Sequence, residues 1–440
     1  MVTSAIWPAL DYSRVPYRLY HDAELYVREQ DRIFCGPVWS FLGLAAEIPK
    51  PGDFRASYVG ETPVIFNRDE SGAVKAFVNR CAHRGALVRR ELFGNGANHI
   101  CIYHQWCYGL DGRLTAIPFR RGIRGKGGLD PSFDMGAHGL RPLRVGEVNG
   151  VLFGTLGEDA EPLEDYLGAP ILEQLRRLFD RPVKVLGYNR QRIRGNWKLY
   201  AENTRDNYHA SLLHEFLVTF GLDRSTQVGG VRMDARHRHD ITWAEADSDD
   251  DELAQQAYAG AGVRSNFLSL QEPALVTFRP ERTDRLNIAI TSVFPSAVFV
   301  QISNSLAVRQ IRPRGVDEVE VFQTMLGYAD DTSEMTLHRL RQANLVGPAG
   351  LVSMEDGEAI ELAHRASKPD PGRTTIIELG GAGVISDRDY RVTDVPLRGF
   401  WSYYAELLGI EPEGQCDEDR PHIPLRSLRR VRRPDRCLTI

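Results

Sequence analysis

Two short Cys/His pairs constrain this sequence more than any other feature. Cys81 and His83 are separated by one residue and Cys101 and His104 by two, and the seventeen residues 84–100 lie between the pairs. Thiolates and imidazoles are ready ligands for transition metals, and two neighbouring loops can direct four such ligands at one centre. We therefore expect these four side chains to converge on a metal site.

The order of ligands within each pair narrows the kind of metal site. A Cys₂His₂ zinc finger separates a cysteine pair from a histidine pair, whereas here each pair contains one of each. Structural zinc and coincidental core residues are the alternatives. In an iron–sulfur centre, thiolates hold one iron firmly, and two neutral imidazoles on the other iron raise the reduction potential. Such a centre accepts an electron easily and passes it on.

Composition excludes several classes of partner. The chain has 440 residues, of which 42% are hydrophobic, enough for two buried cores. Its 54 basic and 59 acidic side chains nearly balance, so we expect no nucleic acid and no membrane as partner, but a small organic substrate. No apolar run approaches the ~20 residues of a spanning helix, and the first residues do not resemble a secretory signal.

We therefore expect a cytoplasmic protein, in which thiols stay reduced. Metal binding by a subset of the cysteines then explains them better than a disulfide framework does. The six cysteines are Cys35, Cys81, Cys101, Cys107, Cys416 and Cys437.

Changes in composition and hydrophobic pattern along the chain predict four parts. We expect an N-terminal helical segment (1–38) that packs on the larger domain, a small antiparallel β-domain (39–157), a larger domain (158–410) and a polar, arginine-rich surface tail (411–440). In the larger domain, the patterns predict helices at 162–180, 197–217, 336–349 and 353–366, and strands at 183–186, 274–278, 286–293, 298–311 and 318–327. The fold class is therefore α+β, with helices packed against an antiparallel sheet.

A second group of possible ligands lies in the larger domain. His209 and His214 are five residues apart, so a straight helix would point them about 140° apart. We expect a distortion between them if both bind one metal. Ferrous iron that keeps positions open for O₂ would take a carboxylate as third ligand. Glu355 and Asp356, after Gly-Pro-Ala-Gly at 347–350, are the candidates, and Asp356 is expected to begin a helix. Two ordinary helix histidines are the alternative.

Both groups of residues carry a resemblance to one family. The motifs Cys-x-His-Arg-Gly and Cys-x-Tyr-His-x-Trp resemble the Rieske [2Fe–2S] motif. The series Asn-Trp-Lys, Glu-Asn, Asp-x-Tyr-His and His, followed by Gly-Pro-Ala-Gly and an acidic pair, resembles the catalytic half of Rieske non-haem iron ring-hydroxylating oxygenases, in their large (alpha) subunit. The likeness runs from 14–17 to 398–401.

The resemblance implies cofactors and residue roles. It implies a Rieske cluster, a mononuclear Fe(II), a helix-grip (START-like) catalytic domain, and Asp356, the second acid of its pair, as the third iron ligand. It also implies that Asp206, one turn before His209, bridges that histidine to a Rieske histidine of a neighbouring subunit, and that Asn203 and Tyr208 border the iron pocket. A helix-surface aspartate is the alternative for Asp206. The implied ligands are Cys81, His83, Cys101 and His104 for the cluster, and His209, His214 and Asp356 for the iron.

Within the family, the sequence is most similar to the branch acting on benzoate-type acids: salicylate 5-hydroxylase, terephthalate dioxygenase and anthranilate (ortho-substituted benzoate) dioxygenases. A carboxylate in a dry pocket needs a cationic partner, and arginine suits it through its bidentate fork. Arg309 and Arg398 are the candidates, with an ordinary structural ion pair as the alternative for each.

The resemblance also implies partners and a reaction. Electrons from NAD(P)H would arrive through a separate ferredoxin or reductase, because the sequence contains neither a dinucleotide-binding motif nor a plant-type ferredoxin cysteine set. O₂ would be the co-substrate, and the product a mono- or cis-dihydroxylated aromatic carboxylate. A trimer, or an α₃β₃ heterohexamer with a small β subunit, is expected. The alternatives are an O-demethylase or monooxygenase on another aromatic compound, and a Rieske electron carrier without oxygenase activity.

Overall fold

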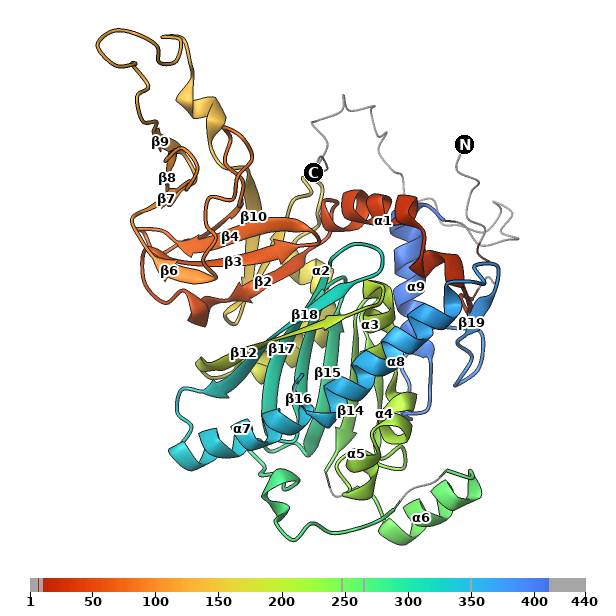
Figure 1. The fold of residues 1–440 in the computed structure, drawn as a ribbon. Helices are drawn as coiled ribbons and strands as arrows, with labels where there is room; N and C mark the ends of the chain where they lie inside the picture. The colour runs from red at the N-terminus through yellow and green to blue at the C-terminus, as the bar shows by residue number, and fades with distance from the viewer. Residues whose placement is uncertain (1–6, 8–10, 247, 264–265, 349, 411–440) are drawn as a thin grey trace.

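The computed structural model describes Trp7 and residues 11–246, 248–263, 266–348 and 350–410. The predicted tail at 411–440 lies outside the described residues, together with Cys416 and Cys437. The described chain forms a small β-domain and a larger domain in which helices cover a broad sheet (Figure 1). Among the described helices, none combines the length and the apolar character needed to cross a membrane.

The small domain is built on a seven-stranded antiparallel sheet with the order β2-β11-β10-β5-β4-β3-β6. Every residue of β2 and of β11 is buried. A three-stranded sheet, β7-β8-β9, extends from this body and lies far from α4 of the larger domain (Figure 1). The strands are β2 (Ser40–Leu44), β3 (Asp53–Val59), β4 (Thr62–Arg68), β5 (Val74–Val78), β6 (Phe93–Asn95), β7 (Asn98–Ile100), β8 (Cys107–Gly109), β9 (Leu114–Ala116), β10 (Pro142–Val148) and β11 (Val151–Thr155).

The larger domain has a second seven-stranded sheet, with the order β12-β18-β17-β16-β15-β14-β13, which is antiparallel throughout. β16 and β17 bury all their residues because they lie in its centre and both faces are covered. The predicted α+β class is thus confirmed. The strands are β12 (Val183–Ile193), β13 (Gly229–Met233), β14 (Asp240–Glu245), β15 (Leu286–Val293), β16 (Ala297–Ile302), β17 (Ser305–Pro313) and β18 (Val319–Tyr328).

Helices α7 and α8 run across one face of this sheet (Figure 1). There α3 and α7 contact the central strand β17, and α8 contacts β12. Helix α2 contacts β13 and β15. The helices are α1 (Ala23–Glu29), α2 (Leu163–Leu178), α3 (Trp197–Asn203), α4 (Asn207–Leu213), α5 (Glu215–Thr219), α6 (Asp251–Gly260), α7 (Ser333–Val346), α8 (Leu351–Ser367) and α9 (Val395–Leu408), and the short helical turns are η1 (Tyr17–Tyr20), η2 (Gln30–Phe34), η3 (Ala45–Glu47), η4 (Met135–His138) and η5 (Pro273–Leu275).

The strand predicted at 274–278 is wrong. Pro273 begins the short turn η5, and the N–H of Thr277 donates to the carbonyl oxygen of Pro273 at 2.9 Å. Proline presets φ for a helical first turn, and here it outweighs the strand propensity of Val276 and Thr277. The predicted strand at 298–311 is also two strands, β16 and β17, joined by a tight turn at 303–304.

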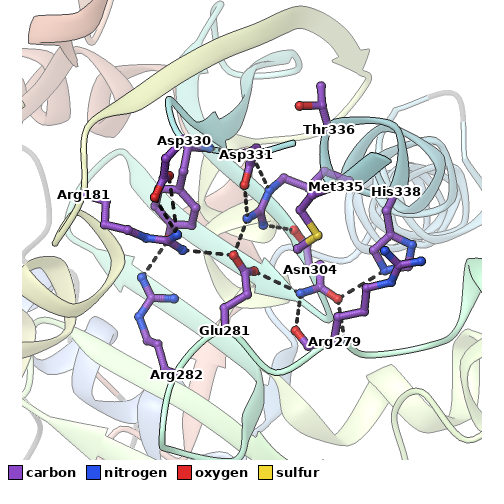
Figure 2. Close-up of polar contacts among 12 residues, drawn as sticks. Arg181, Arg279, Glu281, Arg282, Asn304, Asp330, Asp331, Met335, Thr336 and His338 are labelled. Carbon is purple, nitrogen blue, oxygen red and sulfur yellow. Dashed lines mark hydrogen bonds and ion pairs between the residues drawn. The ribbon is translucent and has the colours of Figure 1, made fainter. Parts of the chain in front are cut away.

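A polar network, rather than a β-ladder, holds the segment that follows η5 (Figure 2). Glu281 accepts hydrogen bonds from Arg181 at 3.0 Å and from Arg339 of α7 at 2.5 Å. Asn304, in the β16–β17 turn, donates to Glu281 at 3.0 Å and to the backbone carbonyl of Arg279 at 2.7 Å. The network therefore ties this irregular segment to both the sheet and α7.

The N-terminal segment packs against the larger domain through a strand pair and a buried charge. β1 (Arg14–Pro16) pairs with β19 (Thr374–Ile376). Glu29 has no exposed surface and accepts hydrogen bonds from Lys198 at 2.5 Å, Trp197 at 2.7 Å and Tyr404 at 2.5 Å. A buried carboxylate needs such partners, so α1, α3 and α9 are fixed to one another at this point.

Replacing Lys198 with Met should destabilise the protein strongly, because Glu29 then stays buried without its cation. Removing one partner of a buried ion pair costs about 3–5 kcal/mol. A fall in the urea midpoint of unfolding measures this loss. The matched control is Arg373→Met, which removes the exposed partner of Asp370 and should change stability by less than about 1 kcal/mol. Equal midpoints for the two variants would contradict the assigned role of Glu29.

Candidate metal centres

The two Cys/His pairs lie in loops of the small domain with the same backbone turn. The N–H of Gly85 donates to the carbonyl oxygen of Cys81 at 3.0 Å, and the N–H of Gln105 donates to that of Cys101 at 2.9 Å. Gly85 and Gln105 have positive φ values of 73° and 56°. The fourth residue after each cysteine therefore closes its loop in the left-handed conformation, which glycine adopts without strain.

The four side chains of these loops divide into a buried pair and a more exposed pair. Cys81 and Cys101 are 3% and 1% exposed, whereas His83 is exposed and His104 is half-buried. The two imidazole rings lie with their centroids 4.5 Å apart. A cluster bound here would have its thiolate-held iron inside the protein and its imidazole-held iron at the surface.

Two neighbouring aromatic residues support the loops. The hydroxyl of Tyr108 accepts a hydrogen bond from the N–H of Ala82 at 3.0 Å and lies 3.2 Å from Sγ of Cys81, to which it would donate once that sulfur is a metal-bound thiolate. The ring of His83 stacks on Trp106 with centroids 4.8 Å apart and an angle of 4°. Tyr108 did not stand out in the sequence, because only the fold shows that its hydroxyl reaches a cysteine of the other loop.

His209, His214 and Asp356 meet in the larger domain. Oδ1 of Asp356 lies 3.3 Å from Nε2 of His209 and 3.2 Å from Nε2 of His214. One ligand atom from each of the three residues lies within 4.8 Å of the other two. The side chains of His214 and Asp356 are 2% and 6% exposed, and that of His209 is 21% exposed. Two imidazoles and one carboxylate that leave further positions open form the ligand set typical of non-haem Fe(II) oxygenases.

A break in the predicted helix 197–217 makes this meeting possible. The segment is three short helices, α3, α4 and α5, so the prediction of one helix is wrong, whereas the expected distortion between the histidines is present. His209 lies inside α4, but His214 has φ −90° and ψ 76° and ends it. This non-helical residue removes the angular mismatch that a straight helix would impose.

Helix α8 brings the carboxylate to the histidines. It begins at Leu351, directly after the Gly-Pro-Ala-Gly segment, so Asp356 lies in its second turn and not at its start as predicted. The amide of Gln191 on β12 donates to the backbone carbonyl of Ser353 at 2.7 Å and fixes the helix against the sheet. Glu355, the other candidate ligand, accepts a hydrogen bond from Nδ1 of His214 at 2.7 Å instead.

The surrounding polar groups orient the two imidazoles. Asp206 caps α4, because its side chain accepts from the N–H groups of Tyr208 and His209, and its Oδ2 lies 3.3 Å from Nδ1 of His209. The amide of Asn203 lies 3.3 Å from Nε2 of His209 and donates to Asp356 at 3.1 Å. The Tyr208 side chain is 40% exposed and so borders solvent.

The charges of this site are strongly coupled. Burial alone would lower the pKa of His209, but hydrogen bonds to Asp206 and Asp356 raise it to about 10. Burial would raise the pKa of Asp356, but the hydrogen bonds and charges of the two histidines hold it well below its ordinary value. The carboxylate of Asp356 is therefore ionised and needs a positive charge beside it. A bound metal ion can supply this charge in place of the proton on His209.

The two arginines proposed from the sequence have different surroundings. Arg309 on β17 is 6% exposed and donates to the hydroxyl of Tyr200 at 3.4 Å and to the carbonyl of Val346 at 3.1 Å. Its Nε has no hydrogen-bond partner, and no carboxylate among the described residues pairs with it. Arg398 is fully buried and donates to the backbone carbonyls of Gly383 at 2.7 Å and Gly381 at 2.8 Å.

Comparison with known families agrees with this architecture. Residues 38–125 match the Rieske [2Fe-2S] domain, and residues 179–404 match the catalytic domain of the ring hydroxylating alpha subunit. These two domains define a Rieske-type oxygenase, an oxidoreductase. The chain belongs to the family of ring-hydroxylating oxygenase alpha subunits, as the motifs predicted.

Similar proteins cover nearly the whole chain. The large subunit of anthranilate 1,2-dioxygenase from Burkholderia cepacia is 43% identical over 92% of this chain and 95% of its own length. The terminal oxygenase component subunit alpha 2 of terephthalate 1,2-dioxygenase from Comamonas sp. is 42% identical over 92% and 98%. The large oxygenase component of salicylate 5-hydroxylase from Ralstonia sp. is 40% identical over 92% and 96%.

Naphthalene 1,2-dioxygenase from Rhodococcus sp. has a similar fold. Its crystal structure superimposes with a TM-score of 0.74 at 24% identity and covers 90% of this chain and 94% of its own. The Rieske and ring-hydroxylating domains imply a [2Fe–2S] cluster and a mononuclear iron, with O₂ as co-substrate. The donor sets fit both groups: two buried thiols with two outer imidazoles for the cluster, and two imidazoles with one ionised carboxylate for the iron.

The acidic pair provides a direct test of the mononuclear site. Asp356→Asn should lose the mononuclear iron and keep the cluster iron, because a neutral amide replaces the carboxylate that lies at Nε2 of both imidazoles. Glu355→Gln should retain the iron with about 10–100-fold weaker affinity, since it only supports His214. Iron analysis and the visible spectrum of the cluster measure the two centres separately. Loss of iron in Glu355→Gln but not in Asp356→Asn would reverse the assignment.

Tyr108→Phe should lower the reduction potential of the cluster. Its hydroxyl would donate to the Cys81 thiolate of a bound cluster, and such a bond favours the reduced, more negative cluster. A bond that strengthens by about 1 kcal/mol on reduction corresponds to roughly 40 mV for one electron. Redox titration followed by EPR measures the shift, and Tyr103→Phe is the control because Tyr103 is an exposed tyrosine of the same loops. An unchanged potential would show that the bond does not tune the cluster.

Proposed function

We propose that this chain is the terminal oxygenase subunit that hydroxylates an aromatic carboxylate of the benzoate type, such as salicylate, anthranilate or terephthalate. One observation supports this choice of substrate: the guanidinium of Arg309 is buried and pairs with no carboxylate among the described residues. The names of the three relatives support the same class of substrate.

The position of Arg309 supports this role. Burial raises the pKa of Tyr200, the charge of Arg309 lowers it, and that of Asp356 raises it, so the phenol lies within electrostatic reach of both groups. An unpaired buried cation is costly, and a substrate carboxylate would relieve that cost through a bidentate pair. Arg398 is the weaker candidate, because the charges of Asp11 and Asp394 already act on it. Its bonds to two backbone carbonyls, at 2.7 and 2.8 Å, are also shorter than the two bonds of Arg309, at 3.4 and 3.1 Å.

The residues of the chain prepare the site for this reaction. Bound in the two sites, the cluster would supply electrons one at a time and the ferrous ion the open positions at which O₂ is reduced. Asp206 and Glu355 hold Nδ1 of His209 and of His214, which directs both Nε2 atoms at Asp356. The low exposure of His214 and Asp356 limits the access of water. Arg309 would fix the acid group and thereby the position of the ring.

Transfer of electrons between subunits is part of the proposal. His104 lies in the loop between β7 and β8, and His83 lies against it, with the two ring centroids 4.5 Å apart, whereas Asp206 caps α4 in the larger domain. The sheet β7-β8-β9 and α4 lie far apart in the same chain (Figure 1). The Asp206 side chain is 26% exposed. Its Oδ1 already accepts from two backbone N–H groups, so a histidine of a second copy would donate to Oδ2, beside Nδ1 of His209. A trimer, alone or as an α₃β₃ assembly with a small β subunit, would supply that copy.

A separate ferredoxin or reductase would deliver electrons from NAD(P)H to the exposed His83 edge. Reduced thiols at Cys81 and Cys101 are needed to hold the cluster, which supports a cytoplasmic site of action.

The substrate class can be tested with the loaded protein. The chain, with both iron centres filled, is supplied with NADH, a reductase and substituted benzoates under ¹⁸O₂, and the products are identified by mass spectrometry. Labelled oxygen in the ring of an aromatic acid is the expected result, and the product distinguishes mono- from cis-dihydroxylation. Oxidation of neutral arenes alone, with both centres intact, would overturn the substrate assignment.

Arg309→Leu should raise KM for the aromatic acid by roughly 100-fold, because truncating one side of a buried charge pair costs about 2–5 kcal/mol. Turnover of the corresponding neutral amide should change little. Steady-state kinetics on the acid and the amide measure the difference. Arg398→Leu is the matched control: it should lower the unfolding temperature and leave the preference for the acid unchanged. The opposite pattern would move the carboxylate site to Arg398.

A further inference from the structure

A third group of metal-binding side chains lies outside both iron centres. His21 follows η1 in the N-terminal segment, Asp317 lies in the β17–β18 turn, and His364 lies in the last turns of α8. One ligand atom from each lies within 4.8 Å of the other two. His364 follows Asp356 by about two turns of the same helix.

The hydrogen bonds of the two histidines define which nitrogens are free. The hydroxyl of Ser367 donates to the carbonyl of Ala363 at 2.8 Å, so Nε2 of His21, 2.9 Å from that hydroxyl, is the donor to it. Nε2 of His364 donates to Oδ1 of Asp317 at 2.8 Å. Both rings therefore carry their proton on Nε2. Nδ1 of each is a buried lone pair without a hydrogen-bond partner among the described residues.

One cation bound between the neighbouring rings could satisfy both of these lone pairs. Leaving one buried polar atom unsatisfied costs about 1–3 kcal/mol, and here the two rings lie with centroids only 4.4 Å apart. A bound cation can accept both lone pairs. Metal-bound imidazoles commonly donate their other N–H to a carboxylate, as His364 does to Asp317. Burial lowers the pKa of His21 to about 4 and also lowers that of His364, so both are in the neutral form that binds metals.

The positive charges near the group are already paired. Lys368 binds Oδ2 of Asp317 at 2.9 Å and leaves Oδ1 facing the histidines. Lys198, a more distant cation that also acts on both histidines, is paired with Glu29 at 2.5 Å. The carboxylate of Asp317 therefore remains available to offset the charge of an ion.

We propose that His21 and His364 bind one divalent transition-metal ion of the zinc type through their Nδ1 atoms, while Asp317 holds the Nε2–H of His364. Imidazole nitrogens are ligands that Zn²⁺ accepts, and the site lies apart from the Rieske loops and the mononuclear triad. The ion would link the N-terminal segment, through His21, to α8, which carries both His364 and Asp356. Its role is structural, because neither histidine contacts the mononuclear site.

Metal analysis of the intact, iron-loaded chain tests the site. The protein is dialysed against micromolar ZnSO₄ and then against metal-free buffer, and zinc and iron are measured together. The wild-type chain should retain a single zinc ion, whereas His21→Gln and His364→Gln retain none, with the iron content and the cluster spectrum unchanged. Zinc should also raise the unfolding temperature of the wild type and not that of either variant.

The matched control is His138→Gln, which removes a half-buried histidine of the small domain and should retain the zinc. The zinc-edge X-ray absorption spectrum should show imidazole nitrogens at about 2.0–2.1 Å. If His364→Gln does not fold, His21→Gln decides, since His21 is only partly buried. Zinc retained equally by His21→Gln, or not retained by the wild type, would overturn the proposal without bearing on the oxygenase reaction.

Discussion

The carboxylate of Asp356 lies between the imidazoles of His209 and His214, and the packing of the larger domain fixes it in this position. A buried carboxylate is stable only when opposite charge and hydrogen bonds surround it. The histidines come from short helices beside the sheet, and the carboxylate from α8, which contacts the edge strand β12. Because α4, α8 and β12 must all keep their positions, the site depends on the packing of the whole domain.

The two iron sites are exposed to different degrees, and the difference suits their proposed tasks. The Rieske loops bury their thiols and leave His83 at the surface, where electrons can enter and leave. The mononuclear triad is mostly buried, which favours a reaction that must exclude water. Under the proposed function, the buried guanidinium of Arg309, which pairs with no carboxylate among the described residues, would favour an anionic substrate.

Several elements were predictable because local chemistry dominates them. The alternating and apolar runs at 286–293 and 318–327 became β15 and β18 nearly residue for residue. The single helix predicted at 197–217 did not form, because Asp206 caps a new helix and His214 leaves the helical conformation. Helix propensity alone could not reveal this break, since no glycine or proline marks it. The strand predicted at 274–278 failed for the opposite reason: a local proline outweighed β-branched neighbours.

The sequence by itself determined the chemistry: which thiols, imidazoles and carboxylates were present, their spacing, and hence the family and its two metal centres. Only the tertiary structure decided how they are used. It placed Glu355 on His214 rather than between the histidines, and it brought the rings of His21 and His364 together. It also buried Arg309 near Tyr200 and bound Arg398 to two backbone carbonyls. These outcomes depend on contacts between residues far apart in the chain, and such contacts follow from packing, which no local spacing encodes.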